Sequence, residues 1–363
     1  MSKAAASSSA MKRARAPVIE ADLAWITTAK LPWASLAGKT VLVSGANGIL
    51  PAYMVETMLY LNEGQNQANP TTVIALVRNR ERALERFSAY QGRLDLKFLV
   101  QDVCQPAVIR QPIHFIVHAA SQASPKFFGA DPAGTLSANV LGTLHLLNLA
   151  REKRPEAFLF FSSGEVYGCL SPAQVPTRED IFGYIDPADV RACYGESKRL
   201  GETMCVAWAH QHGVPAKIVR PFHTYGPGMR LDDGRVFADF VSDIVNHRNI
   251  VMKSDGAAVR AFCYLADAVV GFFTVLFKGE VGQAYNVGND RGELSIRDLA
   301  HLLVELHPDK PLAVMQDEGA KSPSYLRSKI ARNCPDVTKI RQLGWTPTIS
   351  VADGFKRTIQ SFL

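Results

Sequence analysis

Short runs of apolar, often β-branched residues alternate along the first half of the chain with longer stretches whose apolar residues recur at helical spacing. The runs predict buried strands at residues 40–44, 72–77, 96–101, 115–118 and 157–162, and the stretches predict helices at 49–61 and 135–152. Strands that are apolar throughout are typical of parallel sheets, which are covered on both faces. The pattern therefore predicts an α/β protein with a Rossmann-type, doubly wound parallel sheet.

The pattern changes in the second half of the chain. After about residue 180 the sequence becomes richer in proline and glycine, and helices are expected at 235–246 and 264–277. The chain closes on Leu343-Gly344-Trp345 and an amphipathic stretch. We expect residues 186–363 to form mainly a smaller C-terminal α/β lobe. Ligands of open parallel sheets bind at the carboxyl ends of the strands, so a substrate should lie between this lobe and the sheet.

Composition and charge are those of a soluble globular protein. Of 363 residues, 47% are hydrophobic and 20% charged, and no apolar run reaches the ~18 residues of a membrane span. The net charge is +6, but the basic residues are scattered, which favours a small anionic ligand over nucleic acid or a membrane. The six cysteines form no C-x-x-C pair, so we expect reduced thiols, no metal site and a cytoplasmic protein. Residues 1–36 are expected to be a partly disordered tail without a secretory signal.

A glycine turn, Gly45-Ala46-Asn47-Gly48-Ile49-Leu50, follows the first predicted strand and opens the first predicted helix. Glycines let the backbone approach a pyrophosphate, whose charge is stabilised by the N–H groups at the start of the helix. The context predicts a dinucleotide-binding domain over residues 37–185, and a plain left-handed turn is the alternative. Pro51 stands where a third glycine is expected, but proline is tolerated in a first helical turn.

Two polar residues follow later strands of the same domain. Val77 is followed by Arg78, where an acid that binds the adenosine ribose of NAD is usual. Arg78 could accept the 2′-phosphate of NADP, line the pocket or face solvent. Asp102, after the third strand, could meet the adenine or the ribose, or simply begin a turn. We expect a dinucleotide cofactor here, and Arg78 makes NADP an alternative to NAD.

Tyr194 and Lys198 are four residues apart, so on a helix they share one face. A free phenol titrates near pH ~10, and a neighbouring cation favours the phenolate. Such a pair can remove the proton of a sugar hydroxyl while a hydride leaves the same carbon. By itself the spacing is weak evidence, because it arises by chance in many helices. The helix 194–212 that carries the pair is expected to pack on the dinucleotide-binding domain.

The glycine turn and the Tyr-Lys pair belong to a longer ordered series of short motifs. The series runs Gly45-x-x-Gly48, Asp102, His118-Ala119-Ala120-Ser121, Asn139-x-x-Gly142-Thr143, Ser162-Ser163-Gly164-Glu165-Val166-Tyr167-Gly168, Tyr194-x-x-x-Lys198, Arg220-Pro221-Phe222-His223-Thr224-Tyr225-Gly226-Pro227, Arg260-Ala261-Phe262-Cys263-Tyr264, Tyr285-Asn286-Val287-Gly288 and Leu343-Gly344-Trp345. Over about residues 38–361 this resembles the extended short-chain dehydrogenase/reductase family, which contains NAD-dependent nucleotide-sugar epimerases, dehydratases and decarboxylases. Within this family, the motifs resemble most those of UDP-glucuronate decarboxylases.

The resemblance implies roles for individual residues. Ser163 would hydrogen-bond the sugar hydroxyl, Tyr194 would take its proton, and Lys198 would bind the nicotinamide ribose. Asn139 would brace the active-site helix. The implied cofactor contacts are Gly45, Asn47, Gly48, Ile49, Arg78, Asp102, Val103, Ala119, Ala120, Ser121, Asn139, Tyr194, Lys198 and Pro221. The implied nucleotide-sugar contacts are Ser124, His223, Arg235 and Arg260, with the two arginines as candidates for gripping the diphosphate. For Arg235 a solvated helix-start arginine is the alternative reading, and for His223 a satisfied core histidine.

Glu165 bears on the reaction, because related dehydratases and decarboxylases usually have an acid two positions after the catalytic hydroxyl and pure epimerases do not. Oxidation at C4 acidifies the C5 proton, which a carboxylate can remove before water leaves C6; if C6 is a carboxylate, the intermediate loses CO2. Gly164 stands where such dehydratases usually have Asp and decarboxylases Ser. His223 stands where members of the family commonly have an Asn that contacts the sugar nucleotide. We expect a UDP-glucuronate decarboxylase first, then a 4,6-dehydratase, then a 4-epimerase.

Two further expectations concern class and assembly. A noncatalytic dinucleotide-binding protein is the competing class, and an intact Ser163, Tyr194 and Lys198 argue against it. Relatives commonly form homodimers by pairing the helix around Asn139 with the helix that carries Tyr194. The apolar residues of these helices fit either a dimer or an ordinary core face; they are Leu141, Leu144, Leu147, Met204 and Trp208.

Overall fold

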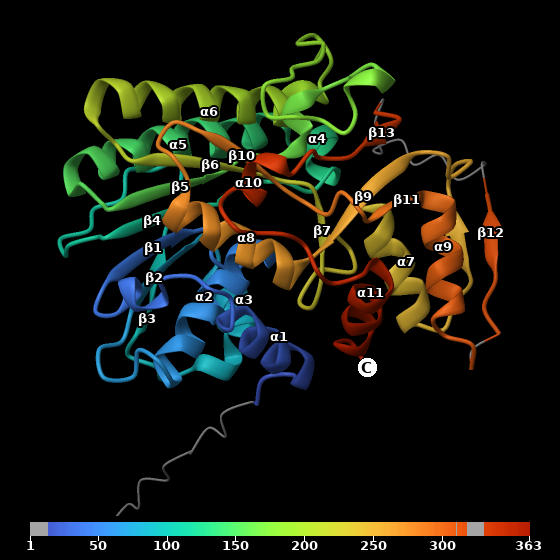
Figure 1. The fold of residues 1–363 in the computed structure, drawn as a ribbon, viewed down its shortest axis with the longest axis horizontal. Helices are drawn as coiled ribbons and strands as arrows, with labels where there is room; N and C mark the ends of the chain where they lie inside the picture. Colours follow the sequence, from blue (N-terminus) through green and yellow to red (C-terminus); the bar gives the residue numbers. More distant parts are fainter. Residues whose placement is uncertain (1–13, 310, 318–329) are drawn as a thin grey trace, which may run out of the picture.

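The computed structural model describes residues 14–309, 311–317 and 330–363. At its centre is a seven-stranded sheet in the order β10-β6-β5-β4-β1-β2-β3, with every neighbouring pair parallel (Figure 1). The strands are β1 (Thr40–Ser44), β2 (Thr72–Val77), β3 (Leu96–Val100), β4 (Phe115–His118), β5 (Ala157–Phe161), β6 (Ala216–Pro221) and β10 (Ala284–Val287). This confirms the predicted Rossmann-type, doubly wound α/β fold.

Two layers of helices cover the sheet, because its strands bury side chains on both faces. Helices α2 (Ile49–Glu63) and α8 (Leu265–Lys278) pack on one face with Val41, Val43 and Val73. Helices α5 (Pro132–Lys153) and α6 (Ala192–His212) pack on the other with Leu42 and Ile74, as Figure 1 shows. The shorter helices α3 (Arg80–Arg86) and α4 (Lys126–Ala130) lie in the connections after β2 and β4.

A smaller lobe of short strands and helices flanks the carboxyl edge of the sheet. Its strands are β7 (His223–Tyr225), β9 (Val259–Tyr264), β11 (Glu293–Ser295) and β13 (Arg332–Asn333) in one sheet, and β8 (Ile250–Met252) with β12 (Val314–Gln316) in a second. Its helices are α7 (Val236–Val245), α9 (Ile296–Glu305) and α11 (Val351–Gln360), and α10 (Thr338–Arg341) lies beside β10. Strands β6 and β10 and helix α8 fall within the range 186–363 yet complete the large unit.

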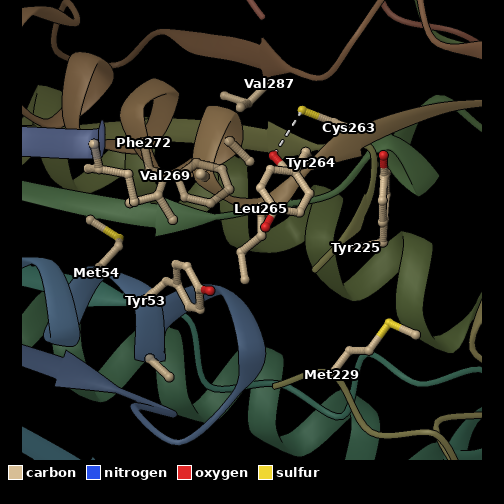
Figure 2. Close-up of a cluster of buried hydrophobic side chains, with 14 of the residues drawn as sticks. Tyr53, Met54, Tyr225, Met229, Cys263, Tyr264, Leu265, Val269, Phe272 and Val287 are labelled. Atoms are coloured by element: carbon tan, nitrogen blue, oxygen red, sulfur yellow. Dashed lines mark hydrogen bonds between the residues drawn. The ribbon is translucent and has the colours of Figure 1, made fainter. Parts of the chain in front are cut away.

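One continuous core joins the two units. Figure 2 shows Tyr53 and Met54 of α2 facing Tyr264 and Leu265, with Tyr225 of β7 beside them. The Tyr225 ring also stacks on Phe355 of α11, with centroids 3.8 Å apart. Large aromatic side chains buried in this way contribute most of the packing energy of such a junction. The two units are therefore joined through one shared buried core.

The predicted N-terminal tail is too long. Residues 1–13 lie outside the described residues, but helix α1 (Pro17–Thr27) and the 3₁₀ turn Trp33–Leu36 pack against the large unit. The Trp33 ring meets Phe273 of α8 edge-on, with ring centroids 5.0 Å apart. The buried Asp22 carboxylate accepts hydrogen bonds from Tyr53 and Tyr264, at 3.2 and 2.6 Å. These partners come from distant parts of the chain, so no local sequence pattern predicts that this segment is ordered.

Candidate active site

The turn after β1 leaves no room for a side chain at Gly45. Gly45 has φ +67°, and a Cβ there would lie 2.7 Å from the Cα of Ala120. The Ala119 and Ala120 N–H groups both donate to the Ser44 hydroxyl at 3.2 Å, which holds the turns after β1 and β4 together. Gly48 caps α2, with Asn47 before it and Ile49 as its first residue. Such a cradle of bare backbone at a helix start suits a pyrophosphate.

Arg78 and Asp102 lie at the carboxyl ends of β2 and β3. The Cys104 N–H donates to the Asp102 carboxylate at 2.8 Å, and this bond, aided weakly by Arg78, keeps the pKa of Asp102 below its usual value. Arg78 itself is exposed. Val103 instead faces the core, where its Cγ1 would lie 2.9 Å from a Cβ at Gly142. Of the three residues, Arg78 and Asp102 are those free to meet an adenosine.

Helix α6 brings Tyr194 and Lys198 to one point next to the end of β5. The Lys198 Nζ donates to the Phe161 carbonyl at 2.7 Å and lies 5.8 Å from the centroid of the Tyr194 ring. The Tyr194 ring stacks almost flat on Phe128 of α4, with centroids 4.9 Å apart and an interplanar angle of 17°. Both side chains are buried. Their orientation is therefore fixed by packing before any ligand binds.

Burial dominates the titration of this pair. It raises the pKa of Tyr194, against the opposing effects of a hydrogen bond with Ser163 and of the Arg235 charge, while Glu165 raises it further. Burial also lowers the pKa of Lys198 to about 7. From the sequence we expect Lys198 to lower the pKa of Tyr194, but the side chains of the structure raise it, so Tyr194 is hard to ionise without a ligand. A cationic ring bound beside the phenol would favour the phenolate.

Asn139 of α5 braces the catalytic helix. Its Nδ2 donates to the Ser197 hydroxyl at 2.9 Å, and Ser197 in turn donates to the Tyr194 carbonyl at 3.0 Å. Among the described residues, the buried Asn139 Oδ1 has no hydrogen-bond partner. Buried polar atoms are usually satisfied, so this acceptor suits a ligand or a water at the site.

A buried series of hydrogen bonds links the end of β1 to α5 through His118. Ser44 Oγ lies 2.8 Å from His118 Nδ1, and His118 Nε2 lies 3.0 Å from Thr143 Oγ1, whose hydroxyl donates to the Asn139 carbonyl. Since Ser44 already accepts two N–H groups, it must donate to Nδ1, which leaves the proton of the neutral ring on Nε2. Burial and the Lys198 charge lower the pKa of His118 to about 3.

This buried neutral histidine should make folding stability fall as the pH drops below about 6.5. The folded pKa is depressed, so the unfolded chain binds the proton first, and the stability contribution is lost between the two pKa values. We expect a loss of about 1 kcal/mol between about pH 6.5 and pH 5.5, measured by denaturant unfolding. His118→Gln should remove this part of the pH slope, whereas His210→Gln, at an exposed position of α6, should keep it. An unchanged slope in His118→Gln would contradict the assignment.

The segment before α6 and the turn after β5 bring a charged pair to the mouth of the site. Glu165 lies in the 3₁₀ turn Gly164–Tyr167, which Ser163 caps by accepting the Glu165 N–H at 3.2 Å. Arg191 Nη2 is 3.7 Å from the Glu165 carboxylate, and its guanidinium lies over the Phe128 ring. A Cβ at Gly164 would come within 3.2 Å of Phe222, so that ring takes up the space of a side chain. Sequence reasoning missed Arg191, Phe128 and Phe222; the run Arg191-Ala192-Cys193-Tyr194 was the available signal for the first.

The predicted substrate residues sit where the two units meet. The Ser124 hydroxyl donates to the Asp233 carbonyl, and Arg235 Nη2 donates to the Ala123 carbonyl at 3.2 Å. Arg260 of β9 donates to the carbonyls of Val259, Ala331 and Ile330. His223, the first residue of β7, has a buried Nδ1 without a hydrogen-bond partner in the described part of the chain. Ser121 lies in the turn after β4, and Pro221 ends β6.

The described residues carry neither a cluster of metal-ligating side chains nor a membrane-spanning helix. They contain no group of three or more His, Cys, Asp or Glu side chains that could hold a metal ion. No helix in the described ranges is both long and apolar enough to cross a membrane.

The chain matches the family model of the NAD dependent epimerase/dehydratase family over residues 41–288. It is 31% identical over 324 residues to UDP-glucuronic acid decarboxylase 6 of Arabidopsis thaliana, which covers 89% of this chain and 88% of the relative. UDP-glucuronic acid decarboxylase 1 of Danio rerio is 30% identical over 325 residues, or 89% of this chain and 72% of the relative.

Solved structures share the fold. The UDP-glucuronic acid 4-epimerase of Bacillus cereus, in complex with UDP-glucuronic acid and NAD, superimposes with a TM-score of 0.74 at 21% identity, covering 89% of this chain and 98% of that one. The dTDP-glucose 4,6-dehydratase of Bacillus anthracis, in complex with NAD, gives 0.73 at 20% identity, covering 89% and 96%. The predicted family is confirmed: this chain is an enzyme of the extended short-chain dehydrogenase/reductase type and belongs to the NAD-dependent epimerase/dehydratase family.

Proposed function

We propose that this enzyme modifies a nucleotide sugar through a transient 4-keto intermediate, and that its reaction is the decarboxylation of UDP-glucuronate with NAD as a recycled cofactor. The observation that carries the proposal is the grouping of Tyr194 and Lys198 with Ser163 and the carboxylate of Glu165. The relatives that are named UDP-glucuronic acid decarboxylases support the same reaction.

The residues of the site fit a nicotinamide dinucleotide. The Gly45 turn offers bare backbone at the start of α2, the buried Asn139 Oδ1 has no hydrogen-bond partner within the described ranges, and Lys198 is buried beside the end of β5. When bound, NAD would supply a reversible hydride acceptor for the sugar carbon. Tyr194 removes the proton of the 4-hydroxyl, Ser163 hydrogen-bonds the same oxygen, and Lys198 holds the ribose.

Decarboxylation then follows from the chemistry of the oxidised sugar. With a ketone at C4 and a carboxylate at C6, the intermediate is a β-keto acid. The C5–C6 bond breaks, CO2 leaves, and the electron pair moves onto the C4 carbonyl oxygen as an enolate. Glu165 is the acid–base group for the proton that C5 must gain. Reduction of the C4 ketone completes a pentose nucleotide.

A 4,6-dehydratase is the second candidate, because a carboxylate at Glu165 can remove the C5 proton of a neutral 4-keto hexose equally well. Against it stands Gly164, because a glycine supplies no acid for the departing hydroxyl, and a Cβ at this position would already come within 3.2 Å of the Phe222 ring. A 4-epimerase comes third because it has no use for Glu165. A noncatalytic dinucleotide binder has no use for a stacked, buried Tyr194 next to Lys198.

Mass spectrometry of the products tests the proposal. The purified enzyme is incubated separately with UDP-glucuronate, dTDP-glucose and GDP-mannose, with and without added NAD, and Tyr194→Phe serves as the inactive control. Loss of CO2 from UDP-glucuronate is the expected result. Loss of water from a hexose nucleotide would assign a dehydratase. An unchanged mass with a new chromatographic peak would assign an epimerase.

Arg78 should decide between NAD and NADP. An arginine next to the ribose pairs with a 2′-phosphate, and a charge-assisted hydrogen bond of this kind is worth about 1.5–3 kcal/mol. Arg78→Glu is therefore expected to weaken NADP binding relative to NAD binding by about tenfold or more, measured by calorimetry. Arg110→Glu, an exposed change before β4 at the opposite edge of the sheet, should leave the ratio unchanged. Equal losses for both dinucleotides in Arg78→Glu would contradict this role.

A homodimer and a cytoplasmic location remain predictions. The outer surface of α5 and α6 exposes four apolar side chains that a second copy could cover, namely Leu136, Leu141, Leu200 and Val206. Leu147 belongs to the core, and Met204 and Trp208 pack against it, so these three contribute to the fold of one chain.

A further inference from the structure

The side chains of the proposed reaction come from two separate segments of the chain. Ser163 and Glu165 lie in the turn after β5, whereas Tyr194 and Lys198 lie on α6. All of them must reach one sugar, so the place of the turn against the helix matters for the rate. A displacement of about 1 Å can cost an enzyme about 10²-fold in rate.

The middle of the turn lies directly against α6. A Cβ at Gly195 would come 3.3 Å from the carbonyl oxygen of Glu165, so no side chain separates the two segments at this point. Arg199, also on α6, donates from its Nε to the Val166 carbonyl at 2.7 Å. These contacts place the backbone of the turn next to the helix.

A buried ion pair between Glu202 of α6 and Arg220 of β6 holds both ends of the same turn. Arg220 donates twice to the Glu202 carboxylate, from Nε to Oε1 at 2.8 Å and from Nη2 to Oε2 at 2.6 Å. The hydroxyl of Ser162, the residue before Ser163, donates to the same carboxylate. At the other end of the turn, the Tyr167 hydroxyl accepts a hydrogen bond from Arg220 Nη1 at 2.9 Å.

The burial of this pair favours a role in geometry. The Glu202 side chain is 12% exposed and that of Arg220 is 3% exposed. A buried ion pair is often no more stabilising than apolar residues of the same volume, so stability alone explains it poorly. A two-point contact between arginine and a carboxylate does, however, fix direction as well as distance. Here it fixes the two groups to which the ends of the turn are bonded.

We propose that Glu202 and Arg220 are positioning residues, which hold the turn after β5 at its working distance from the phenol of Tyr194. They touch no reacting atom and act through the hydroxyl groups at the two ends of the turn. This inference rests on the proposed function, because the place of the turn matters for the rate only if its serine and its glutamate act on the sugar.

Glu202→Gln tests the proposal, because it nearly keeps the shape of the side chain and removes its charge. We expect kcat for UDP-glucuronate to fall by about 10–10²-fold, while KM and the calorimetric affinity for NAD stay within about threefold. The rate at which reduced cofactor forms in a single turnover, followed by its near-ultraviolet absorbance, should fall by a similar factor. A merely structural pair would change the free energy of unfolding and leave these rates of the folded enzyme as they are.

Glu56→Gln controls for the loss of a buried ion pair as such. Glu56 of α2 is 2% exposed and accepts two hydrogen bonds from Arg86, at 2.8 and 2.6 Å, without any bond to the turn after β5. This variant should also lower the free energy of unfolding but keep the native kcat. An equal loss of kcat in Glu56→Gln would overturn the positioning role, because general loosening would then explain both results.

Ser162→Ala removes one hydrogen bond and leaves the ion pair intact, so it decides the question even if Glu202→Gln does not fold. We expect kcat to fall by about tenfold, with KM little changed. The double variant should lose little more than Glu202→Gln alone, because both changes break the same contact.

A native kcat in Ser162→Ala or in folded Glu202→Gln would overturn the positioning role and leave the proposed function standing. Fully additive losses in the double variant would overturn it as well, since the two residues would then act independently. If the native enzyme does not convert UDP-glucuronate, the proposed function falls, and this inference falls with it.

Discussion

Tyr194→Phe is expected to lower kcat by about 10²–10⁴-fold with little change in nucleotide-sugar affinity, because general base catalysis contributes about that much. Phenylalanine keeps the ring that stacks on Phe128, 4.9 Å away, and removes only the hydroxyl that takes the proton. Initial rates of product formation, together with calorimetric affinities for UDP-glucuronate and NAD, separate the two effects.

Tyr184→Phe is the matched control. Tyr184 is 66% exposed in the segment that leads into α6, so losing its hydroxyl should leave the rate unchanged. If Tyr194→Phe still turned over within about threefold of the native rate, the phenol would not be the base, since a catalytic base contributes at least about 10²-fold.

Glu165→Gln should separate oxidation from the later steps. Glutamine has nearly the same shape but cannot transfer the C5 proton, so overall turnover should fall by about 10²-fold or more. Tyr194, Lys198 and Ser163 remain in place, so the first hydride transfer should survive. Reduced cofactor should then accumulate on the enzyme, and its near-ultraviolet absorbance after mixing with UDP-glucuronate measures it.

Glu196→Gln is the matched control, because it removes a negative charge from the same region without touching Glu165. Glu196 is on α6 and pairs with Arg199 at 3.1 Å, with its side chain partly exposed. Its substitution should leave turnover close to native and cause no build-up of reduced cofactor. Native turnover in Glu165→Gln would remove the carboxylate from the mechanism, and loss of the first hydride transfer would show that it acts earlier.

The sheet could be predicted wherever a strand is mostly apolar and carries no charged side chain. Strands β1, β2 and β4 match the predicted runs residue for residue, because each is buried on both faces and carries no charged side chain. Strand β6 gave no such signal, since it contains Lys217 and Arg220. Lys217 Nζ is satisfied by the Leu276 carbonyl at 2.7 Å, and Arg220 pairs with Glu202 at 2.6 Å. Because these partners are distant in the sequence, no local pattern predicts that the two charged residues belong to a buried strand.

The residues of the candidate site could also be predicted only where a local pattern connects them. Tyr194 and Lys198 could be placed together from their spacing, because both are on one helix. Phe128, which stacks on Tyr194, comes from a short helix after β4, and Phe222, which fills the space beside Gly164, comes from the end of β6. No spacing rule connects these segments. Helix α1 was missed for a related reason, because Asp22 is held by tyrosines 31 and 242 residues away.

The fate of the hydrogen at C4 tests the central claim most directly. UDP-glucuronate that carries deuterium at C4 is converted by the enzyme in the presence of excess unlabelled NAD, and the product is examined by mass spectrometry and NMR. If Tyr194 drives a transient oxidation and the same hydride returns, the product keeps the deuterium at C4 and has lost CO2. A product that has lost CO2 and the deuterium, or a substrate that remains unchanged while it stays bound, would contradict the account.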